Sequence, residues 1–319
     1  MKDVIGDIKN NILIHFPRYM NECIAKTSED KLTDLNEIRI RINRPIIASS
    51  TKEYVLADNG FVESSSAPII AEMADLNTIF NSAVRHSPYA YNDEIKNGYI
   101  TLKGGHRVGI CGRAVHNNSN QTISTIKNIS SLNIRISKEI LTAAKEIMTY
   151  VTKEGKLLNT LIISAPSCGK TTVLRDIIRR LSDGISCDAH NVAIADERGE
   201  IAACFNGVSQ NDVGSRTDIL DAVIKAEGIM NLIRSMSPMV IATDEIGTYE
   251  DAKSLKAASL CGVKILCTAH AYDIEDILTN KDTIKKEICS LFDRIVVLQN
   301  LTAPGQIKAI YNASFERIF

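Results

Sequence analysis

The sequence predicts an α/β protein in which a smaller α+β domain precedes a larger domain built on a mainly parallel sheet. In the second half, apolar runs alternate with helical stretches, as in a parallel sheet covered on both faces. A glycine-bearing segment joins the first run to a helical pattern. The first half instead has short alternating segments and tight turns. The runs are Leu157–Ile163, Val192–Ala195, Met239–Thr243, Val263–Thr268 and Ile295–Leu298.

The first half opens with a helical pattern over residues 3–27. Its apolar positions are Val4, Ile8, Ile12, Phe16, Met20 and Ile24. Pro17 should kink or interrupt this pattern. Because acids and bases are mixed on the polar side, packing on the domain or on a neighbouring subunit is favoured over a membrane-surface helix.

Short strands and one further helix follow. Residues 37–42 alternate strictly and Pro45 ends this strand, whose charged face we expect to be solvated. The remaining expected elements are a helix over residues 69–86, strands over 99–102, 106–110 and 131–136, turns at Asn97-Gly98 and Gly104-Gly105, and a polar loop from Asn117 to Asn120.

The 319 residues are enough for about two domains. Residues 138–156 are expected to form a helix and a linker, with Glu154-Gly155-Lys156 near the boundary. We therefore expect an N-terminal α+β domain over 1–150 and the second domain over 151–319. Residues 217–235 carry apolar residues at helical spacing and are expected to form a helix.

Composition excludes several classes of protein. Hydrophobic residues make up 45% and charged residues 24%, which allows a normal core, and a net charge of −1 gives no basic surplus for nucleic acid. The eight cysteines include no Cys-x-x-Cys pair, and several lie in apolar runs, such as Cys261 and Cys267. They indicate reduced, buried cysteines of a cytosolic protein. With no signal-peptide pattern and no bilayer-length apolar run, membrane attachment is expected only through partners or a surface helix.

The strongest motif is a phosphate-binding loop placed between a strand and a helix. Backbone N–H groups and a helix N-terminus favour an anion there, Lys170 can reach the β- and γ-phosphates, and Thr171 offers a hydroxyl to Mg²⁺. Ser164 stands where glycine is usual. The expected nucleotide-binding residues are Ser164, Ala165, Pro166, Ser167, Cys168, Gly169, Lys170, Thr171 and Thr172.

Two acids end the apolar run that starts at Met239. Asp244 is expected near Mg²⁺, usually through water, and Glu245 is expected to orient or deprotonate the attacking water. Such a pair is also a common helix start, but its place downstream of the Lys170 loop favours a catalytic interpretation.

Two further residues follow buried strands. Glu197 is a candidate second water-polarising carboxylate, or else a member of a local ion-pair cluster with its neighbours Asp196 and Arg198. His270 is a candidate sensor of the γ-phosphate, or else a structural hydrogen bonder.

Arginines outside the predicted ATPase core are candidates for stabilising charge on the transferring phosphate. They are Arg107, Arg113 and Arg135, whose alternative role is surface charge or ion pairing. Arg175, Arg179 and Arg180, on the helix after the loop, are expected to be solvated.

The sequence resembles the stage III sporulation protein AA family. The stretches that carry the resemblance are Glu37–Pro45, Gly98–Thr101, Gly104–Ile110, the Lys170 loop, Asp196–Arg198, Gln210–Gly214, Arg234–Pro238, Asp244–Gly247 and Thr268–His270. That family is in turn similar to the hexameric secretion ATPases of type II and type IV pilus systems.

The resemblance implies a RecA-like, Mg²⁺-dependent ATPase that forms a hexameric ring and serves a membrane channel between mother cell and forespore. Lys170 and Thr171 then match the Walker A motif, Asp244 and Glu245 the Walker B motif, Glu197 the acidic box and His270 the histidine box. It also implies an N-terminal domain that packs against neighbouring catalytic domains, membrane-embedded channel proteins as partners, and a peripheral position at the mother-cell face of the forespore membrane.

Two alternatives stay open. A nucleotide-gated scaffold with little turnover would need the loop but not Glu245. A nucleic-acid motor on the same core is disfavoured by the net charge, the absence of Trp and the few aromatics in basic stretches.

Overall fold

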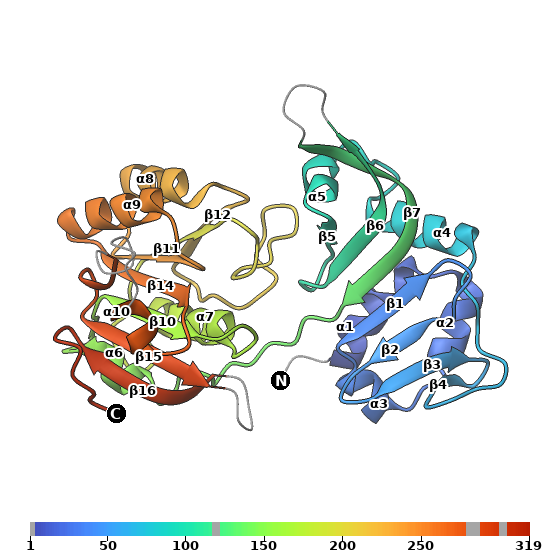
Figure 1. Cartoon of the computed structure of the whole chain (residues 1–319), viewed down its shortest axis with the longest axis horizontal. Coiled ribbons are helices and arrows are strands. Elements are labelled where there is room, and N and C mark those ends of the chain that lie inside the picture. Colours follow the sequence, from blue (N-terminus) through green and yellow to red (C-terminus); the bar gives the residue numbers. More distant parts are fainter. Residues whose placement is uncertain (1–3, 117–121, 279–287, 300–304) are drawn as a thin grey trace. The chain divides into compact units, whose positions relative to one another are not determined.

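The chain divides into two compact units, Met1–Lys138 and Glu139–Phe319 (Figure 1). The computed structural model describes residues 4–116, 122–278, 288–299 and 305–319. The first unit ends before the boundary expected after residue 150. The reason is that Ala144, Ile147 and Met148 are buried in a core of the second unit.

Short helices lie at the start and in the middle of the first unit. They are α1 (Val4–Asn11), a 3₁₀ turn (Leu13–His15), α2 (Arg18–Ile24), α3 (Glu29–Asp34), α4 (Met73–Ala83) and α5 (Asn92–Lys96). The helical pattern over residues 3–27 is confirmed, and it is interrupted just before α2, where Pro17 is the residue that precedes the helix. Proline is tolerated there because that position needs no backbone N–H.

An antiparallel sheet forms the rest of the first unit. Its strands are β1 (Glu37–Arg41), β2 (Ile47–Ser49), β3 (Glu53–Ala57), β4 (Gly60–Val62), β5 (Tyr99–Thr101), β6 (Arg107–His116) and β7 (Ile123–Arg135), in the order β4-β3-β2-β1-β7-β6-β5. Along β1, Ile38 and Ile40 are fully buried while Arg39 is not, as the alternation predicts. The loop expected at residues 117–120 lies outside the described residues.

A mainly parallel sheet organises the second unit. Its strands are β10 (Thr160–Ser164), β11 (Val192–Asp196), β12 (Thr217–Asp221), β13 (Val240–Thr243), β14 (Lys264–His270), β15 (Arg294–Gln299) and β16 (Gln306–Asn312), in the order β12-β11-β13-β14-β10-β15-β16. All neighbours are parallel except β15 and β16. Each of the five predicted apolar runs overlaps most or all of one of these strands, so this α/β architecture is confirmed. A separate ribbon pairs β8 (Thr152–Lys153) with β9 (Lys156–Leu157).

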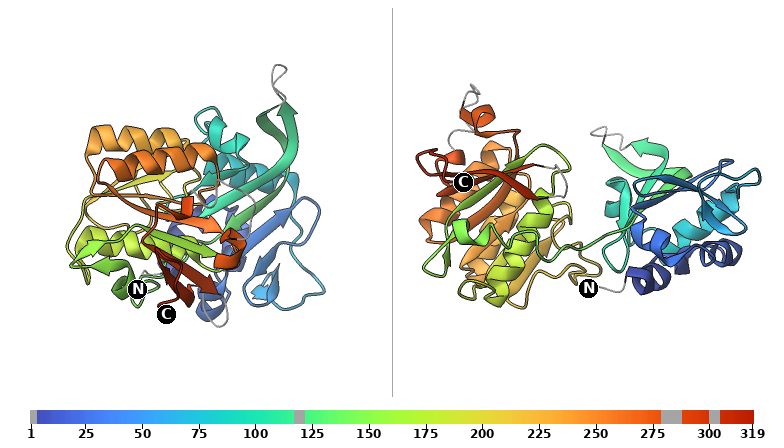
Figure 2. Two further views of the ribbon diagram at one scale, coloured as in Figure 1. Left: turned by 60° about the vertical axis from the view of Figure 1, so that its left-hand side comes forward. Right: turned by 90° about the horizontal axis from the view of Figure 1, so that it is seen from below.

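Helices cover both faces of the parallel sheet (Figure 2). They are α6 (Met148–Val151), α7 (Lys170–Asp183), α8 (Lys225–Met236), α9 (Tyr249–Leu260) and α10 (Ile274–Leu278). Ile163 of β10 packs in the core that contains Ile229 of α8. Ile162, the preceding residue, packs in the core that contains Ile177 of α7. Successive side chains of the strand therefore reach opposite layers, which is why the strands read as continuous apolar runs.

Two local expectations were wrong. The helix predicted over residues 217–235 begins only at Lys225, because residues 217–221 form β12 beside β11. Ile219 and Leu220 pack against opposite cores, as successive residues of a strand do. The helical spacing of the residues that follow led to the wrong assignment. Cys261, expected to be buried, is exposed because it directly follows the last residue of α9. Among the described residues, no helix combines the length and apolarity needed to cross a bilayer.

Candidate functional site

The predicted phosphate loop connects the end of β10 to the start of α7. Gly169 has φ +87° and Ser167 has φ +62°, so the chain turns sharply before Lys170 begins the helix. Ser164 is fully buried as the last residue of β10, where it pairs with His270 of β14. A strand-end position needs no left-handed backbone, which explains why serine fits where glycine is usual. Thr171 and Thr172 lie half-buried in the first turn of α7.

The Lys170 ammonium group is folded back into this loop. Its Nζ donates to the carbonyl oxygens of Ser164 at 3.2 Å and Ala165 at 3.3 Å. It also lies 3.1 Å from Nδ1 of His270. Burial lowers the pKa of Lys170, and the nearby Glu245 carboxylate partly opposes that shift. The cation is thus held by neutral acceptors, which an incoming anion can replace.

Asp244 directly follows β13 and is fully buried. Neither of its carboxylate oxygens has a hydrogen-bond partner among the described residues. Burial, together with the negative charge of Asp196, raises its pKa to about 7. A buried carboxylate without a donor is costly, and its oxygens are ligands of the kind that Mg²⁺ prefers.

Thr171 and Asp244 therefore fit the predicted metal role by their chemistry. The described part of the chain has no group of three or more His, Cys, Asp or Glu side chains that could hold a metal alone.

Glu245 is held in a fixed position beside His270. Its Oε1 lies 2.9 Å from His270 Nε2, and its Oε2 accepts a hydrogen bond from Arg198 Nη1 at 2.7 Å. Its backbone has φ +43°, and its N–H donates to the Thr268 hydroxyl at 2.8 Å. The structure therefore brings Glu245 and His270 together, with the imidazole linking the acid to Lys170.

Glu197 forms an ion pair that the sequence analysis missed. Its carboxylate lies 3.1 Å from Nζ of Lys225, a buried lysine that also donates to the Glu245 carbonyl oxygen at 3.1 Å. Lys225 is the first residue of α8, where a cation opposes the helix dipole. The sequence analysis offered no signal for this pair, because the helix was expected to begin at residue 217. Lys225 joins the two acid-bearing loops through Glu197 and the backbone of Glu245.

The loop after β11 is held by hydrogen bonds with two side chains, Asp196 and Arg175. Asp196 is fully buried and accepts hydrogen bonds from the backbone N–H groups of Glu200, Ile201 and Ala202. Arg175 of α7 donates to the carbonyl oxygens of Glu200 and Ile201. The expectation that Arg175 is solvated was therefore wrong. Its partners are backbone carbonyls, which cannot be predicted from a pattern of residue types.

The three candidate arginines belong to the first unit. Arg107 and Arg135 are cross-strand neighbours on β6 and β7, and the Arg107 guanidinium lies 4.7 Å from the ring centre of Tyr99. Arg113 is exposed and lies opposite Lys127. Their predicted contact with nucleotide stays a prediction, whereas the other predicted site residues all lie in the second unit.

The chain is similar to known proteins over nearly its whole length. The family model described as "Sporulation stage III, protein AA" matches residues 8–318. The chain is 36% identical over 305 residues to "Stage III sporulation protein AA" of Bacillus subtilis (strain 168), covering 95% of each.

Two solved structures share the fold. The Legionella pneumophila ATPase DotB has a TM-score of 0.54 at 14% identity, covering 88% of this chain and 77% of that one. The pilus retraction motor PilT, solved with bound ADP, has a TM-score of 0.54 at 12% identity, covering 87% of this chain and 78% of that one. The RecA-like fold of such ATPases, with a smaller unit preceding the core, is therefore the fold of this chain.

Proposed function

The chain belongs to the sporulation stage III, protein AA family, and we propose that it is a Mg²⁺-dependent ATPase that converts ATP and water to ADP and phosphate. One observation carries the proposal. His270 connects Lys170 of the phosphate loop to Glu245 at the carboxyl edge of the parallel sheet. A phosphate-binding cation and a carboxylate able to act on water are thereby joined through a single imidazole.

Nucleotide binding would replace the internal partners of Lys170. The loop amides and the first turn of α7 would bind the phosphates, and the ammonium group would exchange the carbonyls of Ser164 and Ala165 for phosphate oxygens. Thr171 and Asp244 would hold Mg²⁺, which supplies charge neutralisation to the phosphates when bound.

Glu245 would act on the attacking water once Lys170 has moved toward phosphate. Lys170 only donates, so His270 Nδ1 accepts and His270 Nε2 carries the hydrogen that points to Glu245. When the lysine leaves, His270 can turn toward phosphate and free one oxygen of Glu245 to orient water. Glu197 is proposed as a second carboxylate on that water, positioned by Lys225.

The proposed setting is a ring motor in sporulation. Family membership supports the sporulation role, and the shared fold with a pilus retraction motor supports force generation by a ring. We place a hexamer on the cytoplasmic, mother-cell face of the forespore membrane, energising or assembling a channel with membrane-embedded partners. Arg107, Arg113 and Arg135 are proposed to meet the nucleotide bound by a neighbouring subunit.

The test is ATPase activity measured against oligomeric mass for the wild type, Lys170→Ala and Glu245→Gln. We expect Lys170→Ala to lose nucleotide binding, and Glu245→Gln to bind ATP but hydrolyse it about 10²–10³-fold more slowly. Wild-type turnover by Lys170→Ala would overturn the assignment of the loop. If Glu245→Gln keeps full function in sporulating cells while Lys170→Ala loses it, the chain is a nucleotide-gated scaffold.

A further inference from the structure

Asp176 is a buried carboxylate that the proposed chemistry does not use. It lies on α7, about 9 Å along the helix axis from Lys170 at 1.5 Å per residue, and only 2% of the residue is exposed. Its Oδ1 accepts from Arg179 Nη2 at 2.6 Å, and its Oδ2 accepts from Arg180 Nε at 2.9 Å. Arg179 and Arg180 were expected to be solvated, but both lie against this acid instead.

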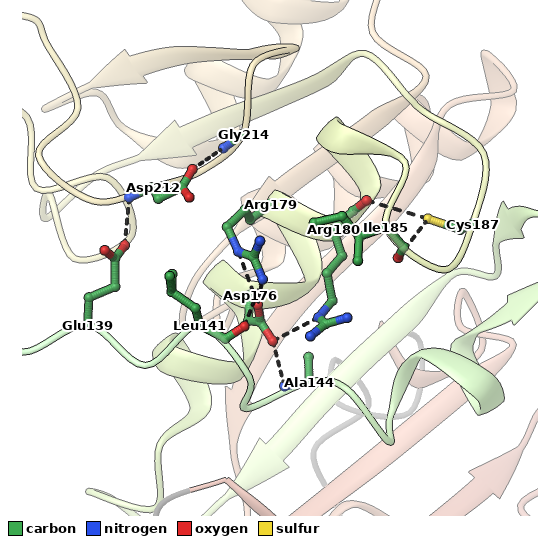
Figure 3. A network of polar contacts seen from close by, with 10 residues as sticks. All are labelled: Glu139, Leu141, Ala144, Asp176, Arg179, Arg180, Ile185, Cys187, Asp212 and Gly214. Carbon is green, nitrogen blue, oxygen red and sulfur yellow. Dashed lines mark hydrogen bonds and ion pairs between the residues drawn. The ribbon is translucent and has the colours of Figure 1, made fainter. Parts of the chain in front are cut away.

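The same carboxylate holds the backbone of the segment that enters the second unit. Asp176 Oδ2 accepts a hydrogen bond from the Ala144 N–H at 2.9 Å, and Arg179 Nη2 donates to the Leu141 carbonyl oxygen at 2.7 Å (Figure 3). The segment Glu139–Ile147, here called the entry segment, is therefore bound to α7 at two points of its main chain. Both contacts are specified by α7 side chains.

A third contact fixes the beginning of the entry segment. Glu139 Oε1 accepts from the backbone N–H of Asp212 at 2.6 Å, and Asp212 Oδ1 accepts from the Gly214 N–H at 3.1 Å (Figure 3). The boundary between the two units lies between Lys138 and Glu139. The entry segment therefore begins with the first residue of the second unit.

The two arginines alone would balance the buried charge of Asp176. The hydrogen bond from Ala144 of the entry segment is therefore not needed for charge balance. Helix α7 also starts at the phosphate loop and donates through Arg175 to the loop that follows Glu197. One rigid element thus touches the phosphate loop, an acid-bearing loop and the entry segment. A shift of α7 on nucleotide binding would reach Ala144 and Leu141 directly.

We propose that Asp176, together with Arg179, is a positioning residue that transmits occupancy of the phosphate loop to the entry segment. This inference rests on the proposed nucleotide binding. Nucleotide bound at the loop restrains the first turn of α7, Asp176 and Arg179 then hold residues 141–144 more firmly, and the restraint reaches Glu139, the first residue of the second unit.

Hydrogen exchange of the full chain, measured by mass spectrometry with and without Mg²⁺ and a slowly hydrolysed ATP analogue, tests the proposal. In the wild type, nucleotide should slow exchange in residues 141–147 by about tenfold. Asp176→Asn should bind the analogue with a Kd within about threefold of wild type and lose that slowing. Asp183→Asn is the matched control, because Asp183 lies on the same helix but accepts from Ser215.

The outcomes separate this inference from the proposed function. A wild type that binds no nucleotide overturns both. A wild type that binds while exchange in residues 141–147 stays unchanged overturns the coupling alone, as does Asp176→Asn with undiminished slowing. If Asp176→Asn does not fold, Arg179→Met removes the Leu141 contact while leaving the Asp176–Arg180 pair, and it should lose most of the nucleotide-dependent slowing.

Discussion

The ammonium group of Lys170 lies 3.1 Å from Nδ1 of His270, a residue one hundred positions later in the chain. Strand pairing produces this contact, because Ser164 of β10 lies opposite His270 of β14. The loop lysine and the histidine are therefore held at one sheet edge by backbone register, before any ligand binds.

His270→Ala should slow ATP hydrolysis by about 10–100-fold while the Kd for nucleotide changes less than about threefold. The reason is that no imidazole remains to turn toward the phosphate and position Glu245, while the loop itself stays intact. Single-turnover hydrolysis and equilibrium binding measure the two effects. His270→Gln, which keeps a donor toward Glu245, should recover part of the rate. A wild-type rate for His270→Ala would show that the histidine is structural only.

Asp244 should make the stability of the second unit pH-dependent. Its folded-state pKa is raised to about 7 from an ordinary 3.8, so the folded chain holds this proton where the unfolded chain has released it. The contribution of the protonated Asp244 carboxyl to the free energy of unfolding is fully present below about pH 4 and is lost as the pH rises through about 7. Thermal unfolding of the nucleotide-free chain should therefore show Asp244→Asn gaining in Tm over wild type between about pH 5 and pH 8. A constant difference in Tm across this range would contradict the assignment.

Lys225→Met should destabilise the second unit by about 1–3 kcal/mol. The substitution removes the buried cation that pairs with Glu197 and donates to the Glu245 carbonyl oxygen. Urea unfolding monitored by circular dichroism measures the loss, and Lys225→Arg, which keeps the charge, serves as the control. Equal stability of Lys225→Met and wild type would show that the lysine does not hold these loops together.

The phosphate loop should tolerate Ser164→Gly and reject Gly169→Ala. Ser164 ends a strand, so glycine there should leave nucleotide affinity within about threefold and cost about 0.5–1 kcal/mol of stability. Gly169 has φ +87°, where alanine is strained. Titration with a fluorescent ATP analogue should show weaker binding for Gly169→Ala and not for Ser164→Gly. Equal affinity of the two variants would contradict the backbone argument.

Local patterns were sufficient to predict the layers and most of the proposed site. Apolar runs of the Leu157–Ile163 type identify buried strands, and acids or lysine placed directly after them fall at one edge of a parallel sheet. The order of those strands is not encoded locally. It depends on which helices pack on each face, so the neighbour relation of β10 and β14 could not be deduced from sequence.

The residues that the sequence analysis missed have partners that cannot be recognised from the pattern of residue types along the chain. Arg175 and Arg179 donate to main-chain carbonyls, which every residue possesses. Lys225 pairs with an acid from a distant loop, and residues 217–221 alternate over too short a stretch to overrule the helical spacing that follows. In each case tertiary contacts decide what local propensity leaves open.

One strand separates the lysine strand from the acid strand, since β14 lies between β10 and β13. Two sheet spacings amount to about 9.5 Å, beyond the reach of a direct contact between strand ends. The strand between them ends in His270, which contacts Lys170 on one side and Glu245, the neighbour of Asp244, on the other. A change that displaces the end of β14 would therefore disturb both contacts at once.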